Sequence, residues 1–591
     1  MVIQMNNNII IHGINGPVIT LHGDTGLSMM EMVYVGKSQL IGEVISMNDH
    51  STTVQVYENT TGLMPGEPVE GSGGPLCVTL GPGILDNIFD GIERPLREIE
   101  NASGSFIERG TAVLPLDETR LWQIRITVAP GDRLSHGMVY AECEETEIIT
   151  HRCMVPIGVS GVVDSITYSV TARLNDTVVT LRDSNDKLHN LTLCQKWPIR
   201  TPRPTAERLY PDTPLITGQR VLDTLFPIAK GGTAAIPGGF GTGKTMTQHQ
   251  MAKWCDADII VYVGCGERGN EMSQVLEEFG GLIDPKSGHP MTNRTVLIAN
   301  TSNMPVAARE ASIYTGITLA EYYRDMGYHV AIMADSTSRW AEALREISGR
   351  LEEMPAEEGF PAYLPSRLSQ FYERAGMVRT LCGNNGSVSI IGAVSPQGSD
   401  FSEPVTQNTK RFIRCFWALD KELAYSRHYP AINWNESYSE YVDDLSGWYT
   451  ENVGSDFLEC RIQLAKILQE ESKLMEIVKL IGADVLPDDQ KLTIEIARVI
   501  RVGFLQQNAY HKDDTYVPME KQLKMMRVIL FLYKSSEAII SAGVPLSRVV
   551  ELGLFDRAIH MKYDVPNDKT ELLDDYFGQF KELLHGLTEF N

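Results

Sequence analysis

Hydrophobic and polar residues alternate along the first part of the chain with the period of two that a half-buried strand shows. Val54 and Val56, for example, lie on either side of a polar residue, and glycines break the segments. Short alternating segments separated by glycine are typical of a small β-barrel or sandwich. The pattern therefore predicts an N-terminal β-barrel over residues 1–75. Proline and glycine punctuate the next passage, residues 76–109, which we interpret as a lead-in to the following unit.

A second region with strand-like patterns covers residues 110–197. Its clearest strand candidates are Ile166–Arg173 and Val178–Arg182. Two prolines within Thr201–Thr205 mark a linker after this region. We therefore predict a separate β-rich region that ends before this linker.

Between residues 198 and 440 the pattern changes to hydrophobic runs of strand length separated by helical segments. The clearest runs are Ile259–Gly264, Thr295–Ala299 and Val330–Ala334. Strands that are apolar on both faces belong to sheets that are covered on both sides. This part of the sequence predicts a nucleotide-binding core built on a parallel sheet.

After about Tyr441 hydrophobic residues recur with the helical period of 3.6. Leu474, Ile477 and Val478 fall on one helix face, and similar stripes follow further along the chain. The sequence therefore predicts a C-terminal helical domain over residues 441–591. The fold class that we expect is multidomain α/β.

The amino-acid composition of the chain limits the classes of protein to which it can belong. The chain has 591 residues, of which 43% are hydrophobic, and its formal net charge is -24. A nucleic-acid-binding motor needs clustered lysine and arginine, so this charge argues against one. No apolar run approaches the roughly 20 residues of a membrane span, and Met1–Asn8 lacks the zones of a signal peptide. Nine scattered cysteines are typical of a reduced cytosolic protein.

A complete phosphate-binding loop pattern, G-x-x-x-x-G-K-T, is the strongest chemical signal. A strand candidate, Thr233–Ile236, precedes it and a helix candidate, Met246–Trp254, follows it. Glycines let the backbone amides point at phosphate oxygens, and the helix adds its positive end. In this pattern the lysine reaches the terminal phosphates and the threonine hydroxyl ligates Mg²⁺. We therefore expect Mg²⁺ and ATP or ADP to be bound here, by Gly238, Gly239, Phe240, Gly241, Thr242, Gly243, Lys244 and Thr245.

Two carboxylates follow predicted strands at the edge where open parallel sheets bind ligands. Asp335 comes directly after Val330–Ala334, which fits a residue that holds Mg²⁺ through water, although it also fits the cap of a following helix. Glu267 lies between glycines after Ile259–Gly264, which fits a catalytic carboxylate that polarises the attacking water. A solvated loop glutamate paired with Arg268 is the alternative, and Arg268 itself fits a contact with phosphate or with Glu267.

Several separated segments form a common set of motifs, namely Gly62-Leu63, Gly66–Val69, Gly238–Thr245, Gly266–Glu271, Met333–Trp340, Gly398–Thr406 and Gly503–Gln507. By these motifs, and over essentially its whole length, the chain resembles the catalytic A (alpha) subunits of V-type and archaeal A-type rotary ATPases. Eukaryotic members usually carry cysteine at the position of Thr242, so the threonine favours a bacterial or archaeal source.

The resemblance implies a RecA-like ATPase core, with residues 110–197 as the bulge that separates A subunits from F-type relatives. It also implies that Tyr429 and Tyr510 enclose the adenine, beside Gln506. Aromatic faces would supply apolar contact there. Taken alone, the two tyrosines would fit core packing better than an adenine contact, and the resemblance reverses that order.

The resemblance further implies an alternating ring of three A and three B subunits, with the active site at an A/B interface that a partner arginine completes. Central-stalk rotor subunits, a peripheral stalk and a membrane sector that moves H⁺ or Na⁺ are the other implied partners, and nucleic acid is not among them. The complex would lie on the cytoplasmic face of a membrane. An acidic turn, residues 481–489, fits either a rotor-facing surface or a solvated helix end.

Two other functions use the same loop. One is a nucleotide-binding ring subunit that does not hydrolyse ATP, but the intact Lys244, Thr245 and Glu267 argue against it. The other is a RecA-like hexameric translocase for RNA or polypeptide, which the net charge and residues 110–197 disfavour.

Overall fold

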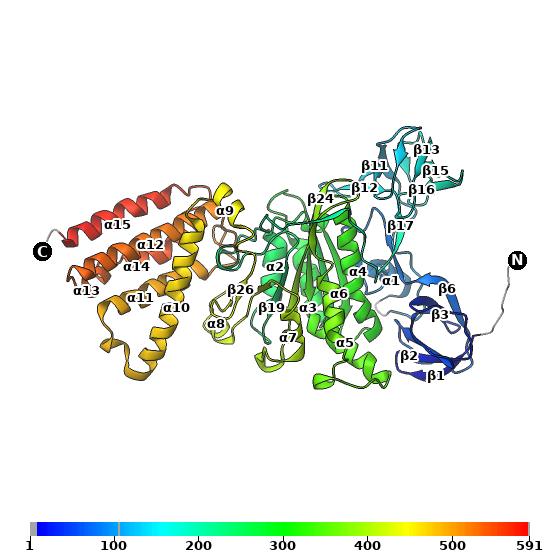
Figure 1. The fold of residues 1–591 in the computed structure, drawn as a ribbon, viewed down its shortest axis with the longest axis horizontal. Coiled ribbons are helices and arrows are strands. Elements are labelled where there is room, and N and C mark those ends of the chain that lie inside the picture. The colour runs from blue at the N-terminus through cyan, green and yellow to red at the C-terminus, as the bar shows by residue number, and fades with distance from the viewer. Residues whose placement is uncertain (1–8, 105–106, 589–591) are drawn as a thin grey trace. The chain divides into compact units, whose positions relative to one another are not determined.

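The structure is a computed structural model that describes residues 9–104 and 107–588 (Figure 1). The predicted ranges 1–75, 76–109 and 441–591 each include a few residues outside this described part. The chain forms two compact units. The first comprises the chain up to Tyr210, Ala257–Pro396 and Asp400–Phe412, and the second comprises Pro211–Asp256, Gln397–Ser399 and the chain from Ile413.

The N-terminal segment of the first unit is a six-stranded antiparallel barrel, as the alternating pattern predicts. A bridge between Ile10 and Pro68 closes it, and hydrophobic residues including Val54 and Val56 fill its interior. The strand order is β1-β2-β5-β4-β3-β6, with β1 (Ile11–Asn15), β2 (Val18–His22), β3 (Glu31–Val35), β4 (Leu40–Met47), β5 (Ser51–Val56) and β6 (Val69–Pro75).

Two four-stranded sheets make up the second β-rich region. One has the order β10-β13-β15-β16 and the other β12-β11-β9-β14. Their strands are β9 (Trp122–Ile126), β10 (Arg133–Leu134), β11 (Val139–Glu144), β12 (Thr150–Met154), β13 (Gly161–Ile166), β14 (Thr171–Ala172), β15 (Val179–Arg182) and β16 (Leu188–Leu191).

The expected single strand Ile166–Arg173 is wrong. The strand β13 ends at Ile166, and β14 belongs to the other sheet, where Thr171 pairs with Gln123. The chain changes sheets between them, and the side chain of Tyr168 in this crossing is 94% exposed. A continuous β pattern in the sequence does not show such a change of partner.

The remainder of the first unit is built on parallel strands in the order β24-β22-β20-β21-β8, and the three predicted hydrophobic runs are strands. Helices α4 and α5 pack along this sheet (Figure 1). The parallel strands are β8 (Ile88–Phe89), β20 (Ile259–Glu267), β21 (Thr295–Thr301), β22 (His329–Asp335) and β24 (Asn385–Val394). The α-helices are α1 (Leu96–Ser103), α3 (Gly269–Gly281), α4 (Val306–Asp325), α5 (Thr337–Arg350), α6 (Leu364–Tyr372) and α7 (Pro404–Lys410). The remaining short strands are β7 (Cys77–Leu80), β17 (Gln195–Pro198), β18 (Glu207–Leu209) and β23 (Gly376–Arg379).

The second unit joins a short sheet to the predicted helical domain. The strand β19 (Thr233–Pro237) pairs in parallel with β25 (Cys415–Phe416), which pairs with β26 (Tyr438–Ser439). The helices are η1 (Val221–Leu225, a π-helix), α2 (Lys244–Trp254), α8 (Lys421–Tyr425), α9 (Ser446–Asn452), α10 (Phe457–Ile481), α11 (Asp488–Arg498), η6 (Val499–Leu505, a π-helix), α12 (Met519–Ser541), α13 (Leu546–Val550), α14 (Leu554–Asp564) and α15 (Leu572–Thr588).

The predicted hydrophobic stripe at the end of α10 is helical but is not buried in this chain. Leu474 and Val478 are half-buried, and Ile477 is 42% exposed. Among the described residues, no helix combines the length and the apolar character needed to cross a bilayer.

We expect Leu21→Ala to destabilise the barrel by about 2–5 kcal/mol, because Leu21 is fully buried in the barrel core and truncation leaves a cavity. Met47→Ala, at a side chain that is 41% exposed at the end of β4, is the matched control and should change the stability by less than about 0.5 kcal/mol. Hydrogen exchange of the barrel amides measures both effects. Equal protection in the two variants would show that Leu21 does not support the barrel.

Candidate functional site

The phosphate-binding loop lies in the second unit, between the end of β19 and the start of α2 at Lys244. Gly241 and Gly243 have φ angles of 79° and 92°, a left-handed conformation that glycine adopts without strain. These two residues turn the backbone so that the loop ends at the N-terminus of a helix of eleven residues. A helix N-terminus offers free amide groups and a positive dipole end to an anion.

Side chains brace the loop from within. The Thr242 side chain is buried, and its Oγ1 donates to the carbonyl of Gly239 over 2.8 Å. The Lys244 Nζ donates to the carbonyls of Gly238 and Gly239 over 2.6 and 3.1 Å, so the ammonium group lies on the loop. Thr245 is half-buried in the first turn of α2, and the Phe240 side chain is 82% exposed.

Gly238 and Gly239 have no room for a side chain. A Cβ at Gly239 would lie 2.2 Å from the Ser399 hydroxyl and 2.8 Å from the Lys421 side chain. A Cβ at Gly238 would lie 2.5 Å from the Thr242 hydroxyl. At these two positions glycine is therefore required by close packing and not by the φ angle.

A cavity of about 600 Å³ in the second unit joins the loop to the predicted adenine residues. Gly241 and Gly243 line it together with Tyr429, Gln506 and Tyr510. The Tyr429 side chain is 44% exposed and that of Tyr510 is 91% exposed, so neither is a core residue. The structure thus brings together the predicted phosphate and adenine residues of this unit.

Several lining residues were not predicted from the sequence. Met246 and Gln250 lie one turn apart on α2, and this spacing after the loop could have indicated them. Tyr563 comes from α14, more than 300 residues after the loop, and no local pattern indicates it. The others are Gln219, Thr247, Arg427, Pro430, Gln507, Asn508, Ala509 and Thr515.

The predicted carboxylates both lie in the first unit, at one edge of the parallel sheet. Glu267 is the last residue of β20 and Asp335 is the last residue of β22, and Asp335 is in register with Gly264. The Asp335 side chain is buried and accepts a hydrogen bond from the Tyr262 hydroxyl over 3.1 Å. The cap of α5 is Ser336, so the structure does not support the capping role for Asp335.

The environment of Glu267 favours its protonated form. Its pKa is raised to about 8, first by burial and then by the negative charges of Asp335 and Glu271. Arg339 acts in the opposite direction. A carboxyl group that titrates near neutral pH can take and return a proton, which is the requirement for general acid–base chemistry.

The backbone before Glu267 is closely packed. Gly266 has a φ of 74°, and a Cβ there would lie 2.8 Å from Arg339 and 2.9 Å from the Arg309 side chain. Arg268 is exposed and takes the N-cap position of α3. The glycine therefore fixes the chain direction at Glu267, which is half-buried and not a solvated loop residue.

The predicted Mg²⁺ ligands have suitable donor atoms. Mg²⁺ prefers oxygen ligands and keeps several waters. Asp335 supplies a carboxylate and Thr245 a hydroxyl, and the buried Ser336 Oγ beside Asp335 has no hydrogen-bond partner, so it is available to a metal-bound water. Within residues 9–104 and 107–588 no group of three or more His, Cys, Asp or Glu side chains is arranged to hold a metal. Taken by itself, each unit therefore offers oxygen donors of the kind that Mg²⁺ prefers.

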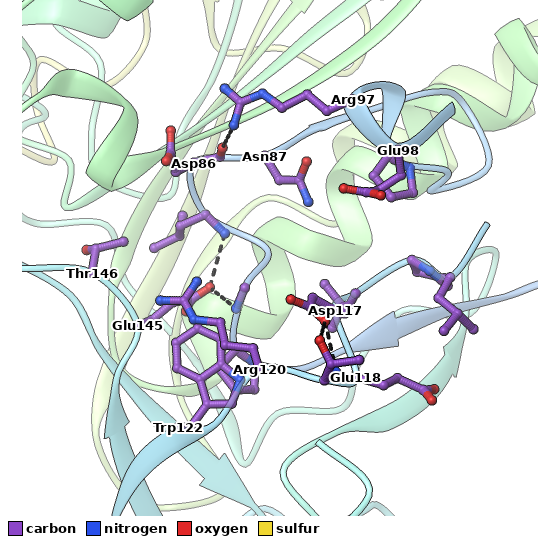
Figure 2. A pocket seen from close by; sticks show the side chains of 18 of the residues that line it. Asp86, Asn87, Arg97, Glu98, Asp117, Glu118, Arg120, Trp122, Glu145 and Thr146 are labelled. Atoms are coloured by element: carbon purple, nitrogen blue, oxygen red, sulfur yellow. Dashed lines mark hydrogen bonds between the residues drawn. The ribbon is translucent and has the colours of Figure 1, made fainter. Parts of the chain in front are cut away.

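The first unit contains a larger cavity of about 1030 Å³, which no sequence pattern indicated (Figure 2). Glu145 accepts hydrogen bonds from two backbone amides, and Arg97 donates to a backbone carbonyl. The Arg120 guanidinium lies 3.8 Å from the centre of the Trp122 ring. Asp117 accepts from a neighbouring threonine. These polar groups are engaged within the protein and do not converge on one point, so we do not assign this cavity to the site.

Four family models match the chain in succession. They describe the beta-barrel domain of the ATP synthase alpha/beta family (residues 11–73), the ATPsynthase alpha/beta subunit barrel-sandwich domain (113–200), the nucleotide-binding domain of the ATP synthase alpha/beta family (218–439) and the C-terminal domain of V and A type ATP synthase (446–550).

Individual proteins are similar over nearly the whole chain. The V-type ATP synthase alpha chain of Halothermothrix orenii is 59% identical over 98% of both chains. The V-type ATP synthase alpha chain 2 of Clostridium tetani is 61% identical over 94% of both chains. The A subunit of the A-type ATP synthase of Methanopyrus kandleri is 55% identical over 97% of this chain and 98% of its own.

One solved structure shares the fold at low identity. The assembled ATPase EscN of the enteropathogenic E. coli type III secretion system is 21% identical, with a TM-score of 0.64 over 88% of this chain and 100% of its own. At that identity the likeness concerns the fold alone.

The raised pKa of Glu267 predicts a pH-dependent stability difference. In the unfolded chain this carboxyl titrates near 4.5, and in the folded chain near 8. Ionising it therefore costs folding free energy that grows from about pH 4.5 to about pH 8. Glu267→Gln removes this cost, so we expect the variant to be more stable than the parent by about 1 kcal/mol or more at pH 8.5, with the difference shrinking towards pH 5. Thermal unfolding at both pH values measures it.

The control is Glu277→Gln, at an exposed glutamate on α3, which should leave the stability nearly unchanged at both pH values. A Glu267→Gln variant whose stability follows that of the parent at pH 8.5 would contradict the raised pKa.

Proposed function

The chain belongs to the family of V-type and A-type ATP synthase alpha (A) chains, and from this we propose how it works as the catalytic subunit of a rotary ATPase. Such a subunit interconverts ATP turnover and the movement of H⁺ or Na⁺ through partner subunits. The observation that carries the assignment is the 55–61% identity over at least 94% of the chain, which includes the matched C-terminal domain. The hexameric translocase and the non-hydrolytic subunit have no comparable support.

In this proposal the second unit binds the nucleotide. Backbone amides of residues 238–243 and the positive end of α2 bind the phosphates, and Lys244 moves from the loop carbonyls to the terminal phosphate. Tyr429 and Tyr510 enclose the adenine, and Gln506 lies beside it. The high exposure of Tyr510 supports this role, because an exposed aromatic side chain has apolar surface that a purine can cover.

The first unit supplies the hydrolytic carboxylates. Glu267 orients and polarises the attacking water, accepts its proton and later releases it. Its pKa of about 8 supports this role, because the group exchanges a proton near neutral pH. Arg268 contacts the phosphates or holds Glu267. Asp335 holds Mg²⁺ through water and Thr245 binds it directly; when bound, the metal neutralises phosphate charge.

The proposed partners are a B-type subunit in an alternating A3B3 ring, the rotor subunits of a central stalk, a peripheral stalk and the membrane sector. The end of α10 and the turn after it support a partner-facing surface, because the hydrophobic side chains of Leu480, Ile481 and Val485 are 84%, 55% and 67% exposed there. Contiguous exposed apolar residues mark interaction sites. The complex would hold this chain at the cytoplasmic face of the membrane.

We expect Glu267→Gln in the reconstituted ring to lower turnover by about 10²–10⁴-fold while the ATP dissociation constant stays within about twofold, since the amide keeps the shape and cannot accept the proton. Steady-state ATPase assays and binding titrations test this, with Glu277→Gln as the control at normal turnover. Parent-like turnover of Glu267→Gln would remove the catalytic role.

The chain alone should hydrolyse ATP at least about 10²-fold more slowly than the ring with a B-type partner, because a partner arginine stabilises the transition-state charge. ATPase assays of each protein alone and of the mixture measure the difference. Stimulation of the isolated chain by nucleic acid, with no effect of the B-type partner, would favour the translocase instead.

A further inference from the structure

The segment that carries Gln506 and Tyr510 follows directly from a helix end. Helix α11 continues into the π-helix η6, which ends at Leu505, and residues 506–510 then line the nucleotide cavity. The last carbonyls of a helix lack partners within the helix. At this end they are bound by two buried cations from distant parts of the chain.

Arg220 is the first of these cations, and its side chain is completely buried. Its Nε donates to the carbonyl of Phe504, its Nη2 to that of Gln506 over 2.8 Å, and its Nη1 to Asp514 Oδ1 over 2.6 Å. The other oxygen of Asp514 accepts from the backbone amide of Asn508 over 2.6 Å. Arg220 therefore holds the segment at two points, directly and through Asp514.

Lys562 on α14 is the second cation, and its side chain is also buried. Its Nζ donates to the carbonyls of Val502 and Gln506 over 2.6 and 3.0 Å. Gly503 allows this approach, because a Cβ there would lie 3.0 Å from the backbone of Ile559, one helical turn before Lys562. The helix α14 thus packs directly on η6 and directs its lysine at the helix end.

Burying these cations is costly. Burial first, and then the charge of Arg220, lower the pKa of Lys562 to about 8, although the charge of Asp514 acts in the opposite direction. Hydrogen bonds to Phe504, Val502 and Gln506 offset the cost at the negative end of a helix. All of these acceptors immediately precede or belong to the cavity-lining segment.

We propose that Lys562 and Arg220 are positioning residues that set nucleotide affinity by fixing residues 506–510 against the cavity. Neither side chain lines the cavity. They act through the backbone of Gln506 and Asn508, so they affect how tightly the nucleotide is held and leave the chemical step unchanged. This inference rests on the proposed nucleotide site.

The test uses Lys562→Met, which keeps an unbranched side chain only one atom shorter and removes the ammonium group. We expect the ADP dissociation constant of the full chain and the KM for ATP of the ring to rise about tenfold, while kcat stays within about twofold. Amide hydrogen exchange over residues 502–510 should be faster. The matched control is Lys569→Met, at an exposed lysine that follows α14, which should change none of these quantities.

A second variant keeps the test decisive if Lys562→Met does not fold. Arg220→Lys retains the positive charge but offers fewer donors, so it should also raise KM and leave kcat nearly unchanged. An unchanged ADP dissociation constant in a folded variant, or a loss of kcat at constant KM, overturns the inference. Absence of ADP binding by the parent chain would instead overturn the proposed function.

Discussion

The left-handed backbone at Gly241 and Gly243 is the constraint on which the nucleotide site depends. Only with these two φ angles does the chain turn from the end of β19 into the first turn of α2 within a few residues. The turn places free amide groups, the positive helix end and Lys244 in one place. The buried hydroxyl of Thr242 then holds the turn by its bond to Gly239. In the proposed function a phosphate group meets backbone donors that are already oriented, and Lys244 moves to it from the loop carbonyls.

The carboxylates of the first unit depend on a different effect, because burial is the main cause of the raised pKa of Glu267. The ends of β20 and β22 place Glu267 and Asp335 at one edge of the sheet, where their charges repel. Asp335 is stabilised by the Tyr262 hydroxyl, and Glu267 responds by holding its proton to a higher pH. In the proposed function Asp335 serves as the metal ligand and Glu267, whose pKa is raised, as the base. The burial and charge repulsion that raise the pKa of Glu267 therefore also cost the fold free energy when this carboxyl ionises.

The sequence predicted the parts of the site that depend on local patterns. The phosphate loop is contiguous, and Glu267 and Asp335 each follow a hydrophobic run long enough to be recognised as a strand. Arg220, Lys562 and Tyr563 were not predicted, because their roles depend on helices from distant parts of the chain that meet only after folding. The prediction of a single strand over residues 166–173 was wrong for a related reason. The two ends of that segment pair with distant strands in two different sheets.

The end of the π-helix η6 explains why cations lie beside the cavity, because the last carbonyls of a helix have no partners within it. A π-helix inserts an extra residue into each turn, so its carbonyls lose the regular spacing of an α-helix, and such segments are frequent at functional sites. Here the last carbonyls of η6 point at Arg220 and Lys562 instead of at the next helical turn. An apolar replacement would leave these carbonyls buried without partners, at a cost of about 1–3 kcal/mol each. The segment that begins at Gln506 would then relax away from its present path. In the proposed function, nucleotide binding and the packing of α14 on η6 therefore depend on the same backbone conformation.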